Sequence, residues 1–396
     1  MGLDSREVTP ELTRAVIHLA AEIRSFGRTE LAVEKVLGVK VSDSTVRRLA
    51  KQVGQELAEL EQTVDRTNDK EVVVPELAVV SCDGGRIRTR EPGCGRGVHL
   101  SGDNGWRETK NASFERMTRN APPADGDDPC IALPTSFRTT KKVANIAEKA
   151  VPDVDEPMNA VASRVRYEGP TRILRTAVSS MACSDEFGPM MKREAQRRRF
   201  FEAHLRAFLG DGLNWNWSIW KCHFSTFIPI LDFIHAIQYV FSAAMAIHAN
   251  ETQAWATYVE LITWCWQGQV TRVIAELASV CRDRGIHPND PVADDALHQP
   301  ILDAIRYLTN NQSRMDYPRY RRLGLPVTSA PMESLIKQMN TRVKGTEMFW
   351  DDPDGAEAIL QIRAAAISDD GRLDGYLTKR PGWQFQRRTS EPRIAA

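Results

Sequence analysis

Residues 314–350, RMDYPRYRRLGLPVTSAPMESLIKQMNTRVKGTEMFW, join a basic, proline-interrupted approach to a stretch with helix signals. Proline fits the first turn of a helix, so Pro331 predicts that a helix starts there. Ser329 is placed to cap this helix and Gly345 to end it. Glu333 then falls in the first turn, where the helix dipole favours a carboxylate.

The predicted helix carries basic residues beside that carboxylate. At about 100° per residue, Lys337 and Lys344 fall on the same side as Glu333. Asn340 lies near them. Residues 314–346 hold seven Lys and Arg against two acids, a local charge of +5 in a chain of net charge zero. This pattern suits a carboxylate that binds a metal ion while its neighbours contact phosphates, although a solvated surface helix gives it too.

Composition places the chain among soluble globular proteins. Its 396 residues, 42% hydrophobic and 26% charged, predict two or three domains. Since the net charge is zero, nucleic-acid binding must come from local basic patches. Seven cysteines form no C-x-x-C pair, which argues against a disulfide framework or a zinc ribbon. We find no signal peptide and no apolar run of membrane-spanning length, and therefore expect a cytoplasmic protein without membrane contact.

The N-terminal region predicts three helices, at residues 13–23, 30–37 and 45–57. Gly38 closes the second helix and residues 42–44 can cap the third, as in a helix-turn-helix. The third helix of such a unit enters the major groove of DNA. The exposed candidates for base contacts are Ser44, Thr45, Arg47, Arg48 and Lys51. Any small three-helix bundle gives the same pattern.

Strand signals begin after residue 70. Residues 76–83 form an apolar run that ends in Asp83. The two glycines that follow predict a turn into an alternating strand at 86–90, and residues 105–110 predict a third strand. An acid at the end of the first of three antiparallel strands is typical of an RNase H-like sheet. The alternative is an ordinary turn aspartate.

A second acid follows a second apolar run. Residues 119–168 show little periodicity and predict a partly ordered excursion. Residues 184–209 then predict a basic helix that leads into a short apolar run. Asp211 comes next, between two glycines, and is a candidate metal ligand or again a turn aspartate.

Residues 224–235 predict a strand that runs into a long helix, with Asp232 and His235 at the junction. We expect His235 to pack beside Asp232 and support the core, not to bind a metal ion. Residues 236–310 are helical throughout, which predicts a helical insertion before the last acid.

Together these features resemble a DDE transposase, and the sequence resembles the ISKra group of insertion-sequence transposases from about residue 30 to residue 376. The stretches that carry the resemblance are SCDGGRIRTRE, GWRETK, GDGLNWNW, LDFIHAIQYV, NNQSRMDYPRYRRLGLP, MES and GAEAILQIRAA. Two motifs depart from the group: TSAPM precedes Glu333 where a Gly-Ser-Gly turn is usual, and KGTEMFW stands for KGSGMRW. Neither departure removes an acid.

The resemblance implies an RNase H-like mixed α/β sheet with a helical insertion, preceded by an all-α helix-turn-helix domain. It also implies that Asp83, Asp211 and Glu333 are catalytic and bind two Mg²⁺ or Mn²⁺ ions, about 4 Å apart in two-metal sites. The expected chemistry is cleavage at the ends of a mobile element, followed by attack of the freed 3′-OH on target DNA. Hard oxygen ligands suit these ions and no thiolate is needed.

The expected partners are double-stranded DNA, as terminal inverted repeats and as target, and further copies of the chain on that DNA, near the nucleoid. Arg47 and Arg48 would read the terminal repeat, while Lys337 and Lys344 would contact backbone at any sequence. A non-cutting DNA-binding repressor and an RNase H-like nuclease remain alternatives. The predicted domains are 1–70 helix-turn-helix, 71–240 core with an irregular insert at about 119–168, 241–313 helical insertion, 314–376 core completion and 377–396 basic tail.

Overall fold

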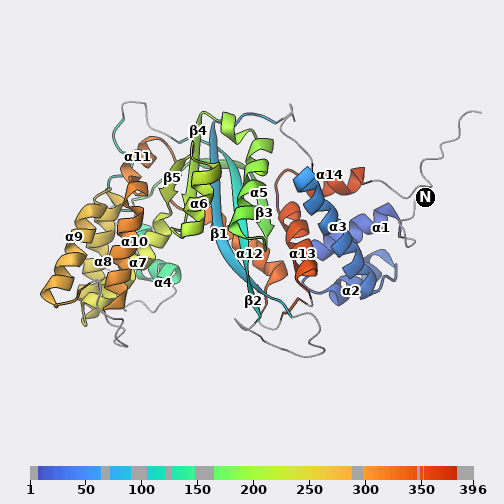
Figure 1. Ribbon diagram of the computed structural model, residues 1–396, viewed down its shortest axis with the longest axis horizontal. Coiled ribbons are helices and arrows are strands. Elements are labelled where there is room, and N and C mark those ends of the chain that lie inside the picture. Colours follow the sequence, from blue (N-terminus) through green and yellow to red (C-terminus); the bar gives the residue numbers. More distant parts are fainter. Residues whose placement is uncertain are drawn as a thin grey trace, which may run out of the picture.

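A five-stranded mixed sheet lies at the centre of the computed structural model (Figure 1). The structure describes residues 8–63, 72–90, 105–120, 126–147, 165–287, 298–345, 348–350 and 352–380. The strands are β1 (Leu77–Arg88), β2 (Trp106–Thr118), β3 (Thr171–Ser180), β4 (Leu205–Gly210) and β5 (Ile228–Leu231). Their order is β3-β2-β1-β4-β5. The first three strands pair antiparallel, while β4 is parallel to β1 and to β5. This is the RNase H-like arrangement, which confirms the predicted fold class.

Strand β1 differs from its prediction because it does not turn at the two glycines. It continues to Arg88, and Gly84 and Gly85 pair with Lys110 and Thr109 of β2. A Cβ on Gly85 would lie 2.7 Å from the Thr109 hydroxyl oxygen. The glycine is therefore needed for the close approach of a neighbouring side chain, not for a turn.

Strand β3 was not predicted. Arg172 and Arg175 interrupt its apolar pattern, yet Arg175 is buried. The Arg175 guanidinium donates to Gln338 Oε1 at 2.9 Å, and its backbone N–H donates to Asp369 Oδ2 at 2.8 Å. Partners distant in sequence thus hold in place an arginine that a local pattern predicts to be exposed, although its Nε and Nη1 have no hydrogen-bond partner.

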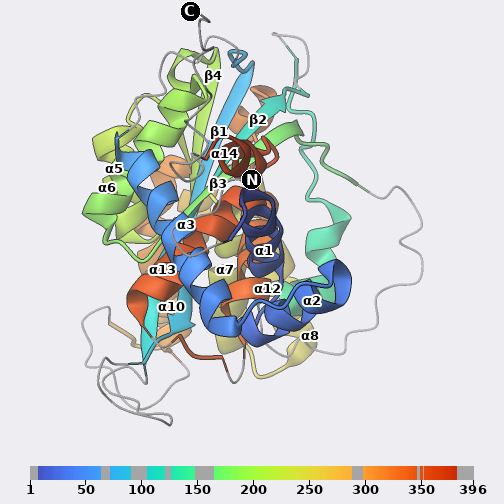
Figure 2. The same cartoon turned by 90° about the vertical axis from the view of Figure 1, so that its right-hand side faces the viewer.

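Helices cover both faces of the sheet (Figure 2). On one face α12 (Ala330–Val343) crosses β1 and β2, and α13 (Pro353–Ala366) runs along β3. On the other face α5 (Ser184–Arg197) contacts β2 and β3. Ala177 packs with the α12–α13 core and Val178 with the α5 core, as alternation along a strand requires.

The N-terminal helices are α1 (Pro10–Glu22), α2 (Phe26–Leu37) and α3 (Asp43–Thr63), close to their predicted ranges. The stripe of α3 that includes Val46, Leu49 and Val53 packs along α13, and the two form one hydrophobic core. Arg342 of α12 is fully buried and donates to the backbone oxygens of Ala20 at 2.6 Å and Arg24 at 3.0 Å. Residues 1–70 were predicted as a separate domain, but their helices share their core with α12, α13 and α14 (Arg372–Lys379).

The helical insertion forms the opposite end of the molecule from the N-terminal helices (Figure 1). It contains α7 (Phe233–Ile247), α8 (Glu251–Trp266), α9 (Val270–Asp283), α10 (Gln299–Asn311) and, following them, α11 (Tyr317–Arg322). None of the described helices is both long and apolar enough to cross a membrane.

The predicted irregular excursion is more ordered than expected over residues 126–147. It contains a 3-10 turn (Thr135–Arg138) and α4 (Thr140–Ala147). Helix α4 packs on α7, where Gln238 donates to the Ile146 carbonyl oxygen at 2.8 Å. Fully buried Arg321 forms an ion pair with Asp128. These partners are distant in sequence, so the segment lacks a local pattern and takes its structure from the helices it contacts.

Candidate active site

Two of the three predicted acids lie side by side, directly after the last paired residues of β1 and β4. The parallel ladder of β1 and β4 pairs Cys82 with Gly210. Asp83 is the next residue of β1, and Asp211 is the first residue after β4. Neighbouring strands are about 5 Å apart, so backbone register alone brings these two residues together.

The electrostatics of this pair are those of carboxylates that repel each other. Burial and the charge of Asp211 raise the pKa of Asp83 to about 6, against an opposing effect of His235. Burial also raises the pKa of Asp211, although the Leu213 backbone N–H stabilises its charged form. Both groups therefore resist ionisation and would gain from a cation close by.

The loop that carries Asp211 is fixed on several sides. The Leu213 N–H donates to Asp211 Oδ1 at 2.8 Å, and Asn216 Nδ2 donates to the same oxygen. Gly212 has φ +99°, and a Cβ there would lie 2.5 Å from the Tyr307 ring. Glycine is thus required at this position both by the backbone conformation and by contact with the insertion.

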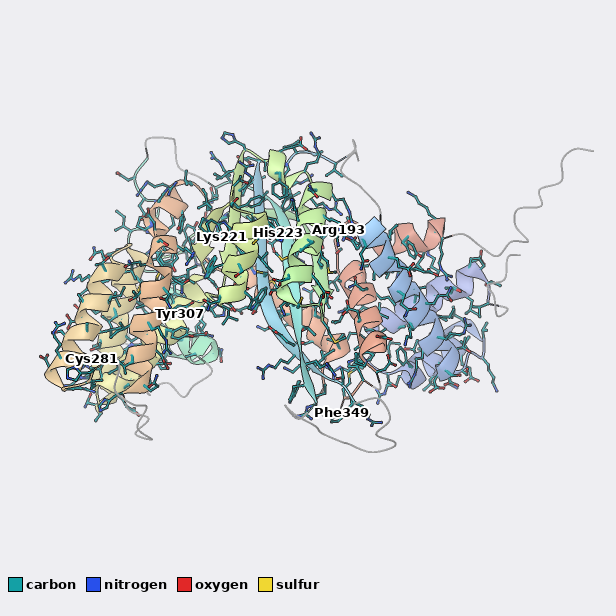
Figure 3. The ribbon with its side chains drawn as sticks, in the orientation of Figure 1. Arg193, Lys221, His223, Cys281, Tyr307 and Phe349 are labelled. Carbon is teal, nitrogen blue, oxygen red and sulfur yellow. The ribbon has the colours of Figure 1, made fainter. Side chains whose placement is uncertain are left out.

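Tyr307 was not predicted to take part in the site. It comes from α10, and its hydroxyl donates to the Asp211 carbonyl oxygen at 2.6 Å. Its ring stacks on Tyr239 with 3.8 Å between centroids, and burial raises its pKa well above the ordinary value. Figure 3 shows Tyr307 on the side of the insertion that faces the sheet. Because 96 positions separate it from Asp211, no local pattern could have indicated the contact.

Asp232 and His235 form a buried pair beside these acids, as expected. His235 Nδ1 lies 2.8 Å from Asp232 Oδ2, and Asp232 is only 1% exposed. Burial would lower the pKa of His235, but the hydrogen bond and charge of Asp232 raise it to about 9. Burial would raise the pKa of Asp232, but His235 and Ser329 bring it below the ordinary value. At neutral pH the pair is therefore a carboxylate and an imidazolium.

Asp232 also holds the start of α12. The Ser329 N–H donates to Asp232 Oδ1 at 2.9 Å, and the Ser329 hydroxyl donates to Oδ2. We predicted that Ser329 would cap α12 with its side chain, but its hydroxyl makes no capping bond. The buried carboxylate is a charged acceptor, and a charge-assisted hydrogen bond is stronger than a neutral cap.

Glu333 lies in the first turn of α12, as predicted. Burial and the charge of Asp232 raise its pKa, while Lys337, His235 and Lys142 oppose the rise. Lys337 Nζ is 4.0 Å from Glu333 Oε2 on an exposed surface. The charges of Asp232 and His235 thus affect the pKa of Glu333 as well as those of Asp83 and Asp211.

The charges of Asp232 and His235 affect all three predicted acids, but the three carboxylates are not grouped closely enough to hold one metal ion. Across the part of the chain that the structure describes, no three His, Cys, Asp or Glu side chains are grouped to hold a metal ion. The donors themselves fit Mg²⁺ or Mn²⁺, since they are carboxylate oxygens, and burial raises the pKa values of Asp83 and Asp211.

The predicted DNA-contacting residues lie on two surfaces. On α3, Ser44 and Arg47 are exposed, Thr45 and Arg48 are half-buried, and the Arg47 guanidinium lies 5.5 Å from the Phe26 ring centroid. Lys51 forms ion pairs with Asp352 at 3.4 Å and Asp354 at 3.6 Å. On α12, Lys337 is exposed and Asn340 is half-buried, and Lys344, which follows the helix, is exposed. DNA contact by these residues remains a prediction.

The sheet order, one acid on β1 beside another directly after β4, and a further acid on a late helix define an RNase H-like protein with an acidic centre. No protein-family model and no curated protein matches the sequence. Among solved structures, the chain is similar to the Drosophila P element transposase strand transfer complex, with 9% identity and a TM-score of 0.39. The match covers 92% of this chain and 93% of that chain.

Proposed function

We propose that this protein is a metal-dependent DNA transposase that cleaves the ends of a mobile element and joins them to target DNA. One observation carries the proposal: Asp83 and Asp211 lie together where the parallel pairing of β1 and β4 ends, with pKa values raised by burial and by neighbouring negative charge. Such pairs of titrating acids are concentrated at functional sites. The motif resemblance to ISKra-group transposases supports the finer assignment.

Asp83, Asp211 and Glu333 would hold two Mg²⁺ or Mn²⁺ ions. Such ions polarise a phosphodiester and orient the attacking and leaving oxygens. Within the chain, Leu213 and Asn216 engage Asp211 Oδ1, which orients the carboxylate. Glu333 would complete the set from α12, whose first turn Asp232 holds through Ser329.

His235 would supply a fixed positive charge behind the acids. Its pKa of about 9 keeps it protonated at neutral pH, and Asp232 occupies its Nδ1. An imidazolium in this position lowers the cost of holding several carboxylates together. Its role is to position and to balance charge, not to bind a metal ion.

The test is nicking of a supercoiled plasmid, with Mg²⁺ or with chelator, by the wild-type chain and by Asp83→Asn, Asp211→Asn and Glu333→Gln. We expect Mg²⁺-dependent nicking that falls by about a thousandfold or more in each variant, as when a member of a catalytic set is lost. Glu202→Gln is the control, because that acid is exposed and paired with Arg199. Wild-type activity in the three acid variants would overturn the proposal.

The same assay separates the alternatives. Nicking without joining of a labelled 3′ end to target DNA would favour an RNase H-like nuclease. DNA binding without nicking would favour a repressor of transposase descent. Gel shift of terminal inverted repeats against random duplex tests whether the chain prefers the element ends. Sedimentation of the complex tests whether several copies of the chain bind together.

A further inference from the structure

Helix α4 brings a lysine to the acidic centre from the side of the helical insertion. The helix packs on α7 (Figure 1), whose first residue, Phe233, directly follows Asp232. Phe137, in the turn before α4, contacts Phe233 with 5.2 Å between ring centroids. Lys142 Nζ lies 5.9 Å from the Phe137 ring centroid. Burial raises the pKa of Glu333 and the charge of Lys142 opposes that rise, so the two groups interact.

The same lysine lines a cavity that reaches the segment before α12. The cavity has a volume of about 420 Å³, and residues 134–137, Lys142, residues 165–167, Trp266 and Thr328 line it. Thr328 directly precedes Ser329, whose N–H and hydroxyl donate to the Asp232 carboxylate. We call this cavity the α4 pocket and define it by six of its side chains: Ser136, Phe137, Lys142, Arg166, Tyr167 and Thr328.

Segment 165–167 is fixed to the rest of the pocket by hydrogen bonds at both of its ends. The Thr135 N–H donates to the Val165 carbonyl oxygen at 3.1 Å, and the Val165 N–H donates to Thr135 Oγ1 at 3.2 Å. The Tyr167 hydroxyl donates to the Leu325 carbonyl oxygen at 2.8 Å. These walls are held in place before a ligand binds, which reduces the entropy lost on binding.

The α4 pocket is positively charged although it adjoins an acidic centre. The described residues that line it include two cations, Lys142 and Arg166, and no acid. Both cations are exposed, and neither forms an ion pair within the part of the chain that the structure describes. An aromatic ring orders a cation without cancelling its charge, so the Phe137 ring leaves the charge of Lys142 available to a ligand.

Two hydroxyl groups complete the chemistry of a phosphate site. Ser136 and Thr328 are half-buried, and neither hydroxyl is hydrogen-bonded to another of the described residues. Lysine, arginine, serine and threonine side chains are common partners of phosphate oxygens in DNA. The two cations would therefore supply charge to a phosphate, while the two hydroxyls would supply directed hydrogen bonds.

We propose that the α4 pocket binds one backbone phosphate of the DNA strand that the acidic centre would cut. The position of that strand rests on the proposed function, whereas binding of DNA by the pocket can be tested without it. Lys337 on α12 and Lys142 on α4 both interact with Glu333, so the strand would be held from two separate elements at this acid.

The test is binding of a random-sequence duplex of 40 base pairs at several salt concentrations, in an Asp83→Asn background that removes nicking. We expect Lys142→Gln/Arg166→Gln to lower the slope of log affinity against log salt by about 0.9, and affinity at physiological salt by about fivefold, because one phosphate contact is lost. Arg272→Gln/Arg282→Gln is the matched control, because it removes two exposed cations from α9. That control should bind as the parent does.

A second set of variants tests the hydroxyls and avoids dependence on one double variant. Ser136→Ala and Thr328→Val each remove one donor without changing the charge of the pocket. We expect each to weaken duplex binding by about two- to tenfold with an unchanged salt slope. Thr271→Val, which removes an exposed hydroxyl from α9, should leave binding unchanged. Thermal melts identify any variant that fails to fold.

The proposal is overturned if Lys142→Gln/Arg166→Gln matches the α9 control in salt slope and affinity, or if the wild-type chain does not bind duplex DNA. Titration calorimetry with inorganic phosphate distinguishes a second source of the same chemistry. A pocket variant that loses inorganic phosphate but binds DNA as the parent does would show that the pocket takes a free anion, and the proposal would again be wrong.

Separate readouts keep this proposal apart from the proposed function. If the wild-type chain nicks DNA while Lys142→Gln/Arg166→Gln binds like its control, the pocket fails and the transposase proposal stands. If the wild-type chain does not nick but the pocket variant loses DNA binding, the transposase proposal fails and phosphate binding by the pocket stands.

Discussion

Asp83 and Asp211 are placed by the backbone, whereas Glu333 is placed by side chains. The β1–β4 register sets the first two side by side, and no side chain is needed to bring them together. Glu333 depends on α12, whose start is held through the bonds from Ser329 to the buried carboxylate of Asp232. The protein should therefore keep its fold when Asp83 or Asp211 is substituted. Glu333, in contrast, should lose its position when Asp232, which holds the start of α12, is substituted.

The largest expected effect is therefore at Asp232. Its carboxylate accepts from the Ser329 N–H at 2.9 Å, the Ile234 N–H at 3.1 Å, the Ser329 hydroxyl and His235. Asp232→Ala would leave these donors unpaired and a half-buried imidazolium without its partner, so we expect a loss of about 3–5 kcal/mol in the free energy of unfolding. Urea unfolding measures the loss. A loss below about 1 kcal/mol would show that α12 does not depend on Asp232.

The next largest effect is a dependence of stability on pH that comes from His235. Its folded pKa of about 9 is above the ordinary 6.5, so its stabilising contribution is full below pH 6.5 and is lost as the pH rises through 9. The side chain is 24% exposed, so the contribution reaches at most about 3 kcal/mol. We expect urea midpoints to fall between pH 7 and 9 in the wild-type chain and to fall less in His235→Asn. An equal fall in both proteins would assign the dependence to other groups.

The same contrast explains what sequence patterns could predict. An apolar run that ends in an acid marked Asp83 and Asp211 as candidates, and a strand does end directly before Asp211, whereas β1 continues past Asp83 to Arg88. The first-turn position of Glu333 followed from helix signals close to it in sequence. The contacts of Tyr307, of Ser329 with Asp232 and of Asp128 with Arg321 had no local signal, because they join segments about 95 to 195 positions apart. The prediction of a turn at Gly84 and Gly85 was wrong for a related reason, since the Thr109 side chain that requires Gly85 lies on another strand.

Substitution of Asp83, one of the two acids placed by the backbone, should raise the stability of the protein, whereas Asp232→Ala lowers it. The folded pKa of Asp83, about 6, is above the ordinary 3.8, so the unfolded chain releases its proton first and stability falls as the pH rises from about 4 to about 6. Without divalent ions at pH 7, Asp83→Asn should therefore be more stable than the wild-type chain by up to about 3 kcal/mol. Thermal unfolding in chelator measures this gain.

Addition of Mg²⁺ should reduce that gain, because a cation offsets the repulsion that Asp83→Asn removes. The control is Glu115→Gln, since burial also raises the pKa of Glu115, but Ser113, Arg172 and Arg175 oppose the rise and outnumber the one acid near it, Asp369. The stability difference between Glu115→Gln and the wild-type chain should not change with Mg²⁺. A destabilised Asp83→Asn would contradict the interpretation of the acid pair as a site of uncompensated charge.

The smallest expected change in stability is that of Tyr307→Phe, and this variant tests whether the helical insertion positions Asp211. Tyr307→Phe removes the hydroxyl that donates to the Asp211 carbonyl oxygen, at a cost of about 1 kcal/mol. Tyr258→Phe is matched to it, because that buried hydroxyl donates to the Phe137 carbonyl oxygen at 2.9 Å and costs a similar amount. If Tyr307 positions Asp211, only Tyr307→Phe should weaken Mn²⁺ binding, by about tenfold, as when a ligand loses its outer partner. Titration calorimetry with Mn²⁺ measures both variants. Equal Mn²⁺ affinities at equal stabilities would show that Tyr307 supports the fold alone, and that the Asp211 loop is held by Leu213 and Asn216 without the insertion.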